Sequence, residues 1–286
     1  MKRVLITGAN SYVGTSVEKW LMKEPNNYHV ETLDMQNPDW INFDFSRFDV
    51  VFHVAGIAHV SKKKSMEDLY YKVNRDLTIQ TAEIAKSNGV KHFIFMSSMI
   101  VYNSKESQIS ANTKPNPDNY YGLSKLQAEE GLEILQSKDF NITIVRPPMI
   151  YGPNSKGNFP KLISLAKKTP VFPRYDNKRS MLYIDNLSNS IKYLIDSVSN
   201  GLFFPQNKEY VNTREVISMT KKIIHKKLWL TRLFNPFIHL LKNRISLVNK
   251  MFSDSYYDFD MSSNILSSSI ISFQESLMMT VNNEKS

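Results

Sequence analysis

The first fourteen residues constrain the fold most, because an apolar run passes through a glycine turn into a helix. Residues 3–7 read Arg-Val-Leu-Ile-Thr and end at Gly8, and residues 16–22 follow with amphipathic helical spacing. Glycines in the turn let strand and helix pack closely and leave helix N–H groups free for a pyrophosphate. Ser11 replaces the usual middle glycine, so its φ must be negative. The pattern predicts a dinucleotide site made by Gly8, Asn10, Ser11, Tyr12, Val13 and Gly14.

Further apolar runs of strand length alternate with helical stretches. They cover residues 29–33, 49–54, 92–96 and 141–146, and a helix that carries Asn74 is predicted over 66–88. Such alternation predicts an α/β fold with a parallel sheet, whose ligands bind beyond the carboxyl ends of the strands. The residues that follow the runs should therefore gather at one edge of the sheet: Asp34, Ala55, Gly56 and Ser98.

Asp34 is a candidate ligand of a ribose. It follows Gly14 by 20 residues, the spacing of an acid that binds a ribose diol. The alternative is that Asp34 is only a carboxylate in the turn that ends the strand and binds no ribose. Because Asp34 would bond to a 2′-hydroxyl and repel a 2′-phosphate, and Met35 and Gln36 supply no cation, NAD is the expected cofactor and NADP the alternative.

Tyr121 and Lys125 form the candidate catalytic pair. They lie four residues apart in the segment Asn-Tyr-Tyr-Gly-Leu-Ser-Lys at 119–125, so a helix would place them on one face. A neighbouring cation lowers the pKa of a phenol from about 10 toward neutrality, which suits a general acid or base. With 14 tyrosines in the chain this spacing alone is weak, and the motifs around it strengthen it.

Composition excludes several classes of protein. The chain has 286 residues and no cysteine, which excludes disulfides and thiolate chemistry and fits a reducing, cytoplasmic location. The apolar N-terminal run is too short for a signal peptide or a membrane span. His53 and His59 lack a further ligand at metal spacing, so no metal site is expected. The net charge of +9 is spread along the chain, which indicates a basic surface rather than nucleic-acid binding.

The second half of the chain differs in composition. Residues 152–180 are rich in glycine and proline and are predicted to form a loop-rich cover over the substrate. Residues 226–242 are apolar with cations at both ends, but Arg232 and Pro236 interrupt them, so no membrane-spanning helix is expected. An amphipathic cap or a subunit contact, which leaves a homodimer open, is favoured over a membrane-surface anchor.

Taken in order, these motifs resemble the extended short-chain dehydrogenase/reductases over nearly the whole chain. The shared motifs are the glycine turn, Asp34, His53-Val54-Ala55-Gly56, Asn74, Ser97-Ser98, Tyr121-x-x-x-Lys125 and Arg146-Pro147-Pro148. Within that superfamily the chain is similar to NAD-dependent nucleotide-sugar epimerases and dehydratases. The similarity to that group lies in residues 70–74, 101–102, 151–153 and 179–185. Through residues 151–159 and 203–207 the chain is most similar to bacterial UDP-N-acetylhexosamine 4-ketoreductases and 4-epimerases of surface-polysaccharide pathways.

The resemblance implies a Rossmann-like, doubly wound sheet that binds NAD(P) in residues 1–150. A smaller sugar-nucleotide-binding part is implied for 151–286, of which about 181–198 packs back on the first part. Catalytic roles fall on Ser98, Tyr121 and Lys125, and substrate contacts on Ser98, Asn158 and Arg179. Met149 stands where the group often carries a substrate-binding asparagine. The other implied cofactor contacts are Asp44, Val54, Ala55, Gly56, Asn74, Tyr121, Lys125 and Pro147.

The implied activity is oxidoreduction at C4 of a UDP-sugar. Reduction of a UDP-4-keto-6-deoxy-N-acetylhexosamine, for capsule or O-antigen precursors, is favoured by the reductase-like segment at 152–158. A UDP-hexose or UDP-N-acetylhexosamine 4-epimerase and a non-catalytic NAD(P)-binding protein are the alternatives. Dehydratases that resemble this chain carry an acidic pair after the catalytic hydroxyl, whereas Met99 and Ile100 occupy those positions here, so dehydration is not expected.

Overall fold

A computed structural model describes residues 1–58, 64–242 and 244–283. Within them lies a central sheet of six parallel strands, in the spatial order β10-β6-β4-β3-β1-β2. The strands are β1 (Lys2–Thr7), β2 (Tyr28–Leu33), β3 (Val50–His53), β4 (His92–Met96), β6 (Asn141–Val145) and β10 (Gly201–Phe203). The predicted α/β fold with a Rossmann-like parallel sheet is confirmed.

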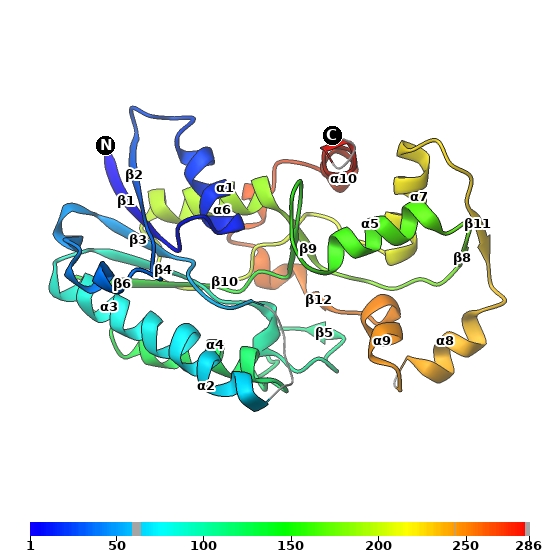
Figure 1. Ribbon diagram of the computed structural model, residues 1–286, viewed down its shortest axis with the longest axis horizontal. Coiled ribbons are helices and arrows are strands. Elements are labelled where there is room, and N and C mark those ends of the chain that lie inside the picture. The colour runs from blue at the N-terminus through cyan, green and yellow to red at the C-terminus, as the bar shows by residue number, and fades with distance from the viewer. Residues whose placement is uncertain (59–63, 243, 284–286) are drawn as a thin grey trace.

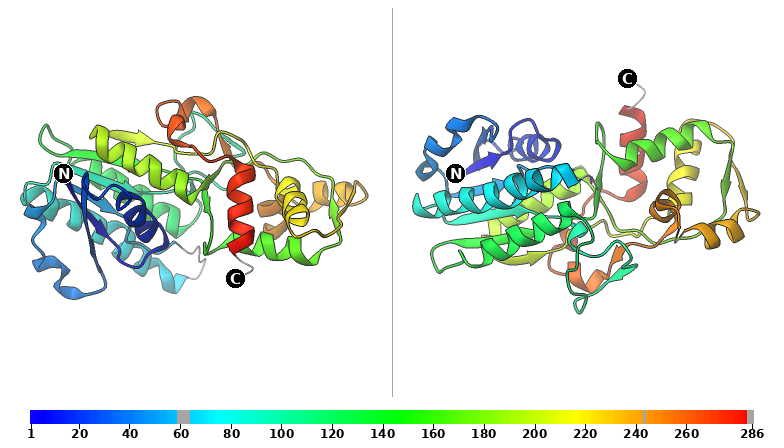
Figure 2. Two further views of the ribbon diagram at one scale, coloured as in Figure 1. Left: turned by 90° about the horizontal axis from the view of Figure 1, so that it is seen from above. Right: turned by 60° about the horizontal axis from the view of Figure 1, so that its bottom comes forward.

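Helices cover both faces of the sheet (Figure 1, Figure 2). Val4 and Ile6 of β1 pack on one face against α1 and α6, and Leu5 packs on the other face against α3 and α4. Burial of both faces explains why the strands read as continuous apolar runs. The covering helices are α1 (Tyr12–Leu21), α6 (Ile184–Ser197), α3 (Leu77–Ser87) and α4 (Tyr120–Glu133).

The strand order places a switch point between β1 and β3. The stretch between β2 and β3 forms two short 3-10 helices, η1 (Pro38–Asn42) and η2 (Phe45–Arg47), so β3 pairs directly with β1. Open α/β sheets bind ligands at the carboxyl ends of strands beside such a switch point. The Gly8 turn follows β1 and Val54 follows β3, so both lie at this point.

The helix predicted over residues 66–88 is interrupted. It consists of α2 (Glu67–Tyr70), a π-helical segment, η4 (Tyr71–Asp76), and then α3, preceded by a 3-10 turn, η3 (Lys64–Met66). A π-helical turn shifts the side chains that follow it around the helix axis, and such turns are frequent at functional sites. Asn74 lies on this turn and is fully buried.

The C-terminal part is built from short elements and lies beside the sheet (Figure 1). The predicted loop-rich cover at 152–180 was wrong in part, because a helix forms within it. Pro160 does not break this helix, since it is the third residue, where the N–H has no intrahelical partner. The elements are β7 (Met149–Tyr151), α5 (Asn158–Lys168), β8 (Val171–Pro173), β9 (Met181–Tyr183), α7 (Thr213–Ile223), β11 (Trp229–Thr231), α8 (Asn235–Leu241), α9 (Ser246–Phe252), β12 (Tyr256–Tyr257), η6 (Phe259–Ser262), η7 (Leu266–Ser268) and α10 (Phe273–Asn283).

Two segments of the C-terminal half return to the sheet. Helix α6 lies against α1, where Tyr28 donates a hydrogen bond of 2.6 Å to Asp196. Strand β10 then extends the sheet beside β6. Short strands also join the halves, because β12 pairs with β5 (Gln108–Ile109). The division at residue 150 stays a prediction.

A buried ion pair joins α4 to β6. The Nε atom of Arg146 lies 3.0 and 3.1 Å from the two carboxylate oxygens of Glu129, and these side chains are 7% and 2% exposed. Ser97 donates a hydrogen bond to Glu129, and the Tyr102 hydroxyl accepts one of 2.8 Å from Arg146. The carboxyl ends of β4 and β6 are thereby tied to α4.

We expect Arg146→Met to lower the free energy of unfolding by about 3–5 kcal/mol, because it leaves a buried carboxylate without its partner. Urea denaturation would measure the loss, and adding Glu129→Leu should restore part of it. The matched control is Arg3→Met, which breaks the exposed Arg3–Asp49 pair and should cost less than about 1 kcal/mol. Equal losses in Arg146→Met and Arg3→Met would contradict the prediction.

Candidate active site

Ser98 and Tyr121 meet at the carboxyl end of β4. Asn119 caps α4 by accepting a hydrogen bond of 2.9 Å from Gly122, which starts the helix just before Tyr121. Ser98 begins a 3-10 turn, η5 (Met99–Val101), and its side chain accepts a hydrogen bond of 3.3 Å from Ile100 N–H. Burial raises the pKa of Tyr121 to about 12, and the nearby Ser98 hydroxyl opposes that rise.

Lys125 lies one turn further along α4 and is 4% exposed. Its Nζ donates a hydrogen bond of 2.9 Å to the Met96 carbonyl and lies 4.5 Å from the centre of the Phe95 ring. Burial lowers the pKa of Lys125 to about 7, while Glu129 opposes that change. The expected lowering of the Tyr121 pKa is therefore not seen: burial dominates, and the ammonium is bound to a backbone carbonyl.

Asn74 fixes the loop after β3 against α4. Its side chain accepts a hydrogen bond of 2.8 Å from Ile57 N–H and donates to Ile57 O and to Ser124 Oγ, both at 3.1 Å. Gly56 fits beside it, since a Cβ there would lie 2.9 Å from the Asn74 side chain and 3.3 Å from Lys125 Nζ. These bonds hold Asn74 next to Lys125, and the predicted contact between Asn74 and the cofactor stays a prediction.

The glycine turn has the features of a dinucleotide cradle. Gly8 has φ +102°, and a Cβ there would lie 2.8 Å from the Ala55 backbone nitrogen, so the loops after β1 and β3 meet closely. The condition on Ser11 is met: its φ is −72°, and its hydroxyl accepts a hydrogen bond of 3.1 Å from Gly14 N–H. Asn10 has φ +61°, an uncommon value outside glycine that is often found at functional sites. The first N–H groups of α1 can bind a pyrophosphate here.

The acids predicted to face the cofactor lie near this turn. Asp34 directly follows β2, is exposed, and accepts a hydrogen bond of 2.9 Å from Gln36 N–H. Gly8 N–H donates to Leu33 O at 2.9 Å, which places the turn beside the end of β2. Asp44 is exposed and caps η2 by accepting from Ser46. The remaining predicted contacts follow other strands of the sheet: Val54 and Ala55 after β3, and Pro147 after β6.

The predicted substrate residues lie in the C-terminal part. Asn158 is exposed at the start of α5. The Arg179 guanidinium donates to the carbonyls of Lys250, at 2.9 Å, and Ser253, at 3.2 Å, which lie near the end of α9. The substrate roles of Asn158 and Arg179 stay predictions. Tyr12 and Val13 lie at the start of α1, and the buried Tyr12 hydroxyl has no hydrogen-bond partner in the described structure.

His53 is a neutral core histidine. Thr78 Oγ1 donates to the Asn74 carbonyl at 2.9 Å, so at 3.0 Å it must accept from His53 Nε2, and Thr7 then donates to Nδ1 at 2.8 Å. Burial lowers the pKa of His53 to about 3. His59 lies outside the described residues. Among those described, no group of three His, Cys, Asp or Glu side chains could hold a metal ion.

The sequence reasoning missed Glu129, Ser97 and Tyr102. All three bond in the network around Arg146, directly behind the candidate site. Glu129 had a detectable signal, because it follows Lys125 by four residues on the same helix and therefore shares its face. Ser97 and Tyr102 had no such signal, since their partners lie far along the chain.

Comparison with known sequences places the chain in a defined group. The model of the NAD dependent epimerase/dehydratase family matches residues 4–204. A UDP-glucose 4-epimerase of Vibrio cholerae is 31% identical over 80% of this chain and 77% of that protein. An N-acetyl-alpha-D-glucosaminyl-diphospho-ditrans,octacis-undecaprenol 4-epimerase of Escherichia coli O157:H7 is 29% identical over 83% of this chain and 75% of that protein.

Solved structures share the fold. A UDP-glucuronic acid 4-epimerase from Bacillus cereus in complex with NAD aligns with a TM-score of 0.78 and 23% identity, over 99% of this chain and 96% of that one. A dTDP-4-dehydrorhamnose reductase from Clostridium acetobutylicum aligns with a TM-score of 0.74 and 20% identity, over 99% and 100%. Identities this low show a common fold. No helix in the described part of the chain is long and apolar enough to cross a membrane.

We expect Lys125→Met to stabilise the protein, and more so at lower pH. Burial lowers the pKa of Lys125 to about 7, against about 10.4 for an unfolded lysine. Between these values the unfolded chain binds a proton that the folded protein lacks, so stability rises with pH, and the penalty of burying the charge is full below about pH 7. At about 2–4 °C per kcal/mol, calorimetry should show the variant melting about 4 °C or more above the wild type near pH 6.5.

The difference in melting temperature should shrink toward about pH 9, where less of the penalty remains. Lys105→Met, which removes an exposed lysine, is the matched control and should leave the melting temperature unchanged at both pH values. A Lys125→Met variant that melts below the wild type at both would contradict this account.

Proposed function

This chain belongs to the NAD dependent epimerase/dehydratase family, and we propose that it is a 4-epimerase of a UDP-linked hexose or N-acetylhexosamine. Family membership makes it an NAD-dependent enzyme of the nucleotide-sugar group. One observation carries the proposal of chemistry at C4: the hydroxyls of Ser98 and Tyr121 lie beside each other at the carboxyl end of β4, so one substrate oxygen can contact both. Lys125 lies one helical turn away, buried beside Gly56 and Asn74.

The roles follow from these positions. Bound NAD would supply reversible hydride transfer at C4, with return to the opposite face of the sugar carbon inverting it. Tyr121 accepts the proton of the C4 hydroxyl and gives it back, and Ser98 donates a hydrogen bond to the same oxygen. A fixed donor in a dry site typically stabilises a developing charge by about 2.7–4 kcal/mol. Because burial holds the pKa of Tyr121 at about 12, the Lys125 cation has to leave Met96 O and approach the phenol when the site is filled.

The remaining proposed contacts hold the two ligands. The glycine turn from Gly8 to Gly14 and the start of α1 bind the cofactor pyrophosphate, and Asp34 binds a ribose diol. Arg179 and Asn158 are the proposed contacts to the UDP part, for which a bidentate guanidinium is suited. Nη1 of Arg179 donates hydrogen bonds to the carbonyls of Lys250 and Ser253. The other N–H groups of the guanidinium are the proposed contacts to a diphosphate.

Epimerisation is preferred to reduction because two similar relatives are 4-epimerases, one of UDP-glucose and one of an undecaprenyl diphosphate-linked sugar. Reduction of a UDP-4-keto-6-deoxy-N-acetylhexosamine is the second candidate, supported by the reductase-like segment at 152–158. It would use the same three side chains and release the oxidised cofactor. Either activity fits the synthesis of surface polysaccharides.

Dehydration is not proposed, because the residues after Ser98 cannot move a proton. Met99 and Ile100 form the η5 turn, and the Met99 sulfur accepts a hydrogen bond of 3.7 Å from Ser255. A thioether and an aliphatic chain can act neither as acid nor as base. A non-catalytic role is disfavoured because Ser98, Tyr121 and Lys125 are all retained.

A reaction assay tests the proposed activity. Purified protein with NAD⁺ and UDP-glucose or UDP-N-acetylglucosamine should give the C4 epimer, detected by chromatography, without net formation of NADH. Stoichiometric oxidation of NADH by a 4-keto-6-deoxy substrate, without epimerisation, would instead establish the reductase. A product lighter by one water in mass spectrometry would overturn the exclusion based on Met99 and Ile100.

Tyr121→Phe should nearly abolish turnover, by about 10²-fold or more, because it removes the group that transfers the proton. NAD binding, measured by titration calorimetry, should stay close to that of the wild type, since the phenol ring is kept. Tyr120→Phe is the matched control: this neighbouring hydroxyl bonds to Glu67 and should be dispensable. Full activity in Tyr121→Phe would refute the proposed acid and base.

A further inference from the structure

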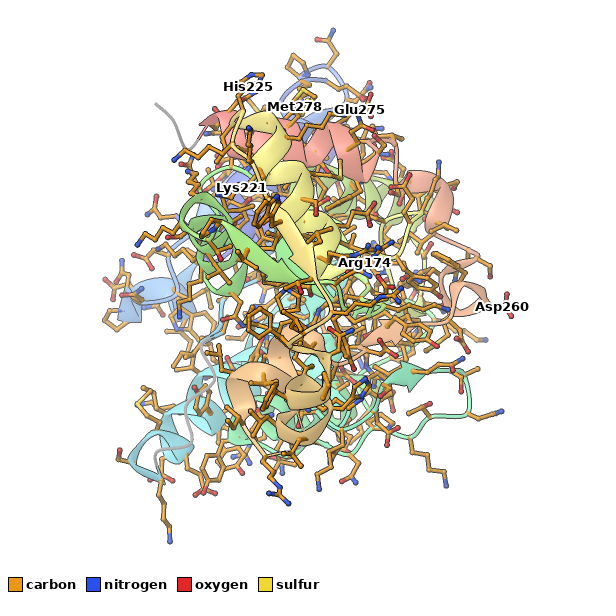
Figure 3. All side chains as sticks on the ribbon, turned by 90° about the vertical axis from the view of Figure 1, so that its right-hand side faces the viewer. Arg174, Lys221, His225, Asp260, Glu275 and Met278 are labelled. Carbon is orange, nitrogen blue, oxygen red and sulfur yellow. The ribbon has the colours of Figure 1, made fainter. Side chains whose placement is uncertain are left out.

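One end of the C-terminal part carries exposed apolar side chains. We call this surface the apolar tip, and its residues are Trp229, Leu233, Phe234, Phe237, Leu240 and Leu247. Trp229 is 79% exposed and Leu233 78%. They lie on β11, α8 and α9 and the segment before α8, at the end of the molecule furthest from the sheet (Figure 1). Figure 3 looks onto this end, with Arg174 and His225 on the visible face.

The apolar tip stands on a packed support. Ile238, on the opposite side of α8, is buried with Phe172, Tyr175 and Phe252. Asn235 at the start of α8 donates a hydrogen bond of 3.0 Å to the Arg174 carbonyl, and β11 pairs with β8. The helix is therefore anchored by one face. Its other face carries Phe237 and Leu240, three residues apart, and the exposed Leu233 and Phe234 directly precede the helix.

The same stretch of chain is strongly basic. Residues 216–253 contain eight Lys and Arg and no Asp or Glu, a net charge of +8 against +9 for the whole chain. The positive charge is therefore concentrated here and is not spread along the chain as predicted. Most of these cations are exposed: Lys222, Lys226, Lys227, Arg232, Arg244 and Lys250. Of the acids at the borders, Asp176 pairs with Arg214 at 2.7 Å and Asp254 accepts from Lys178 N–H at 2.8 Å, while Glu215 is exposed at the start of α7.

We propose that the apolar tip docks on the surface of an anionic lipid bilayer. An apolar surface flanked along the chain by exposed cations matches such a bilayer, where aromatic and aliphatic side chains enter the headgroup region and cations bind lipid phosphates. Trp229 has the side chain that is enriched at membrane interfaces. This proposal does not rest on the proposed activity.

A second copy of the chain is a poorer occupant of the surface. In a two-fold symmetric dimer the same patch lies on both subunits, so the basic stretches of two copies would face each other. Like charges brought together at an interface oppose association. The sequence pattern alone favoured a cap or a subunit contact at 226–242. Trp229, Phe237 and Leu240 are exposed on the same basic stretch of chain as these cations, which favours the bilayer instead.

Vesicle sedimentation tests the proposal with the full-length protein. Phosphatidylcholine vesicles that contain phosphatidylglycerol should carry the protein down, and pure phosphatidylcholine vesicles should not. Added salt should weaken the binding, because the cations then interact less with the lipid phosphates. Fluorescence of Trp229 should shift to shorter wavelength on binding, and Trp229→Phe should remove most of that shift.

Two variants separate the apolar and the charged contributions. Phe237→Gln with Leu240→Gln should lower vesicle affinity roughly ten-fold or more, since it removes the buried apolar area. Lys226→Gln with Lys227→Gln should lower it roughly five-fold for each cation. Matched controls are Ile134→Gln, which changes an 83% exposed side chain at the end of α4, and Lys105→Gln with Lys138→Gln.

The controls should bind like the wild type, and circular dichroism melts should be unchanged in every variant, because all the altered side chains are exposed. Absence of binding to phosphatidylglycerol vesicles would overturn the proposal, as would equal loss in the controls. A wild-type dimer that Phe237→Gln with Leu240→Gln converts to monomer in sedimentation velocity, without vesicle binding, would show that the surface joins two copies.

Discussion

The ion pair between Arg146 and Glu129 is the interaction on which the site depends. It lies between α4 and the carboxyl ends of β4 and β6, where neither charge can reach water. A buried charge without its partner is costly, so α4 is held in the register that places Glu129 opposite Arg146. Tyr121 and Lys125 lie eight and four residues earlier on that helix, and their height and rotation at the sheet edge follow from the pair. We infer that its chief effect is this alignment, since apolar residues of similar volume often stabilise a fold as well as a buried ion pair does.

Helix α4 is less stable than a purely structural helix would be, because it buries the polar side chains of the site. The side that faces the sheet buries Tyr121, Lys125 and Glu129, where a structural helix would bury apolar residues. Its apolar contacts come mainly from Ala128 and Leu132. The burial of Lys125 disfavours its charged form, and it also keeps water out of the site. Without water, each hydrogen bond to a reacting oxygen is stronger. Sites that break the local rules of folding in this way are expected where a chain performs chemistry.

The sequence predicted the features that depend on local pattern. Strands buried on both faces, the glycine turn and the end of the strand at Asp34 are all set by neighbouring residues, and the structure has them. The ion pair was missed because Arg146 and Glu129 lie on different elements. The pair matters for stability because both side chains are buried, and burial depends on how distant segments of the chain pack together. Prolines misled in one place: Pro160 was taken as a loop signal, but it lies in the first turn of α5, where proline is tolerated. Roles that depend on bound ligands, such as that of Arg179, leave no trace in local pattern.

Hydrogen bonds link the C-terminal part to the residues that hold the catalytic helix. Tyr257 of β12 donates a hydrogen bond of 3.1 Å to the backbone carbonyl of Arg146, directly behind the ion pair. Two residues earlier, Ser255 lies opposite Arg179 in a parallel bridge and bonds to Lys178 O and Ser180 N–H. The Arg179 guanidinium in turn binds the carbonyls near the end of α9. A cation there also interacts favourably with the negative end of the helix dipole. A diphosphate bound by the other N–H groups of Arg179 would therefore lie beside the end of α9, the helix that carries Leu247 of the apolar tip. The Arg179 side chain, the end of α9 and the catalytic helix are thus joined by backbone and hydrogen bonds that pass through Ser255, Tyr257 and Arg146.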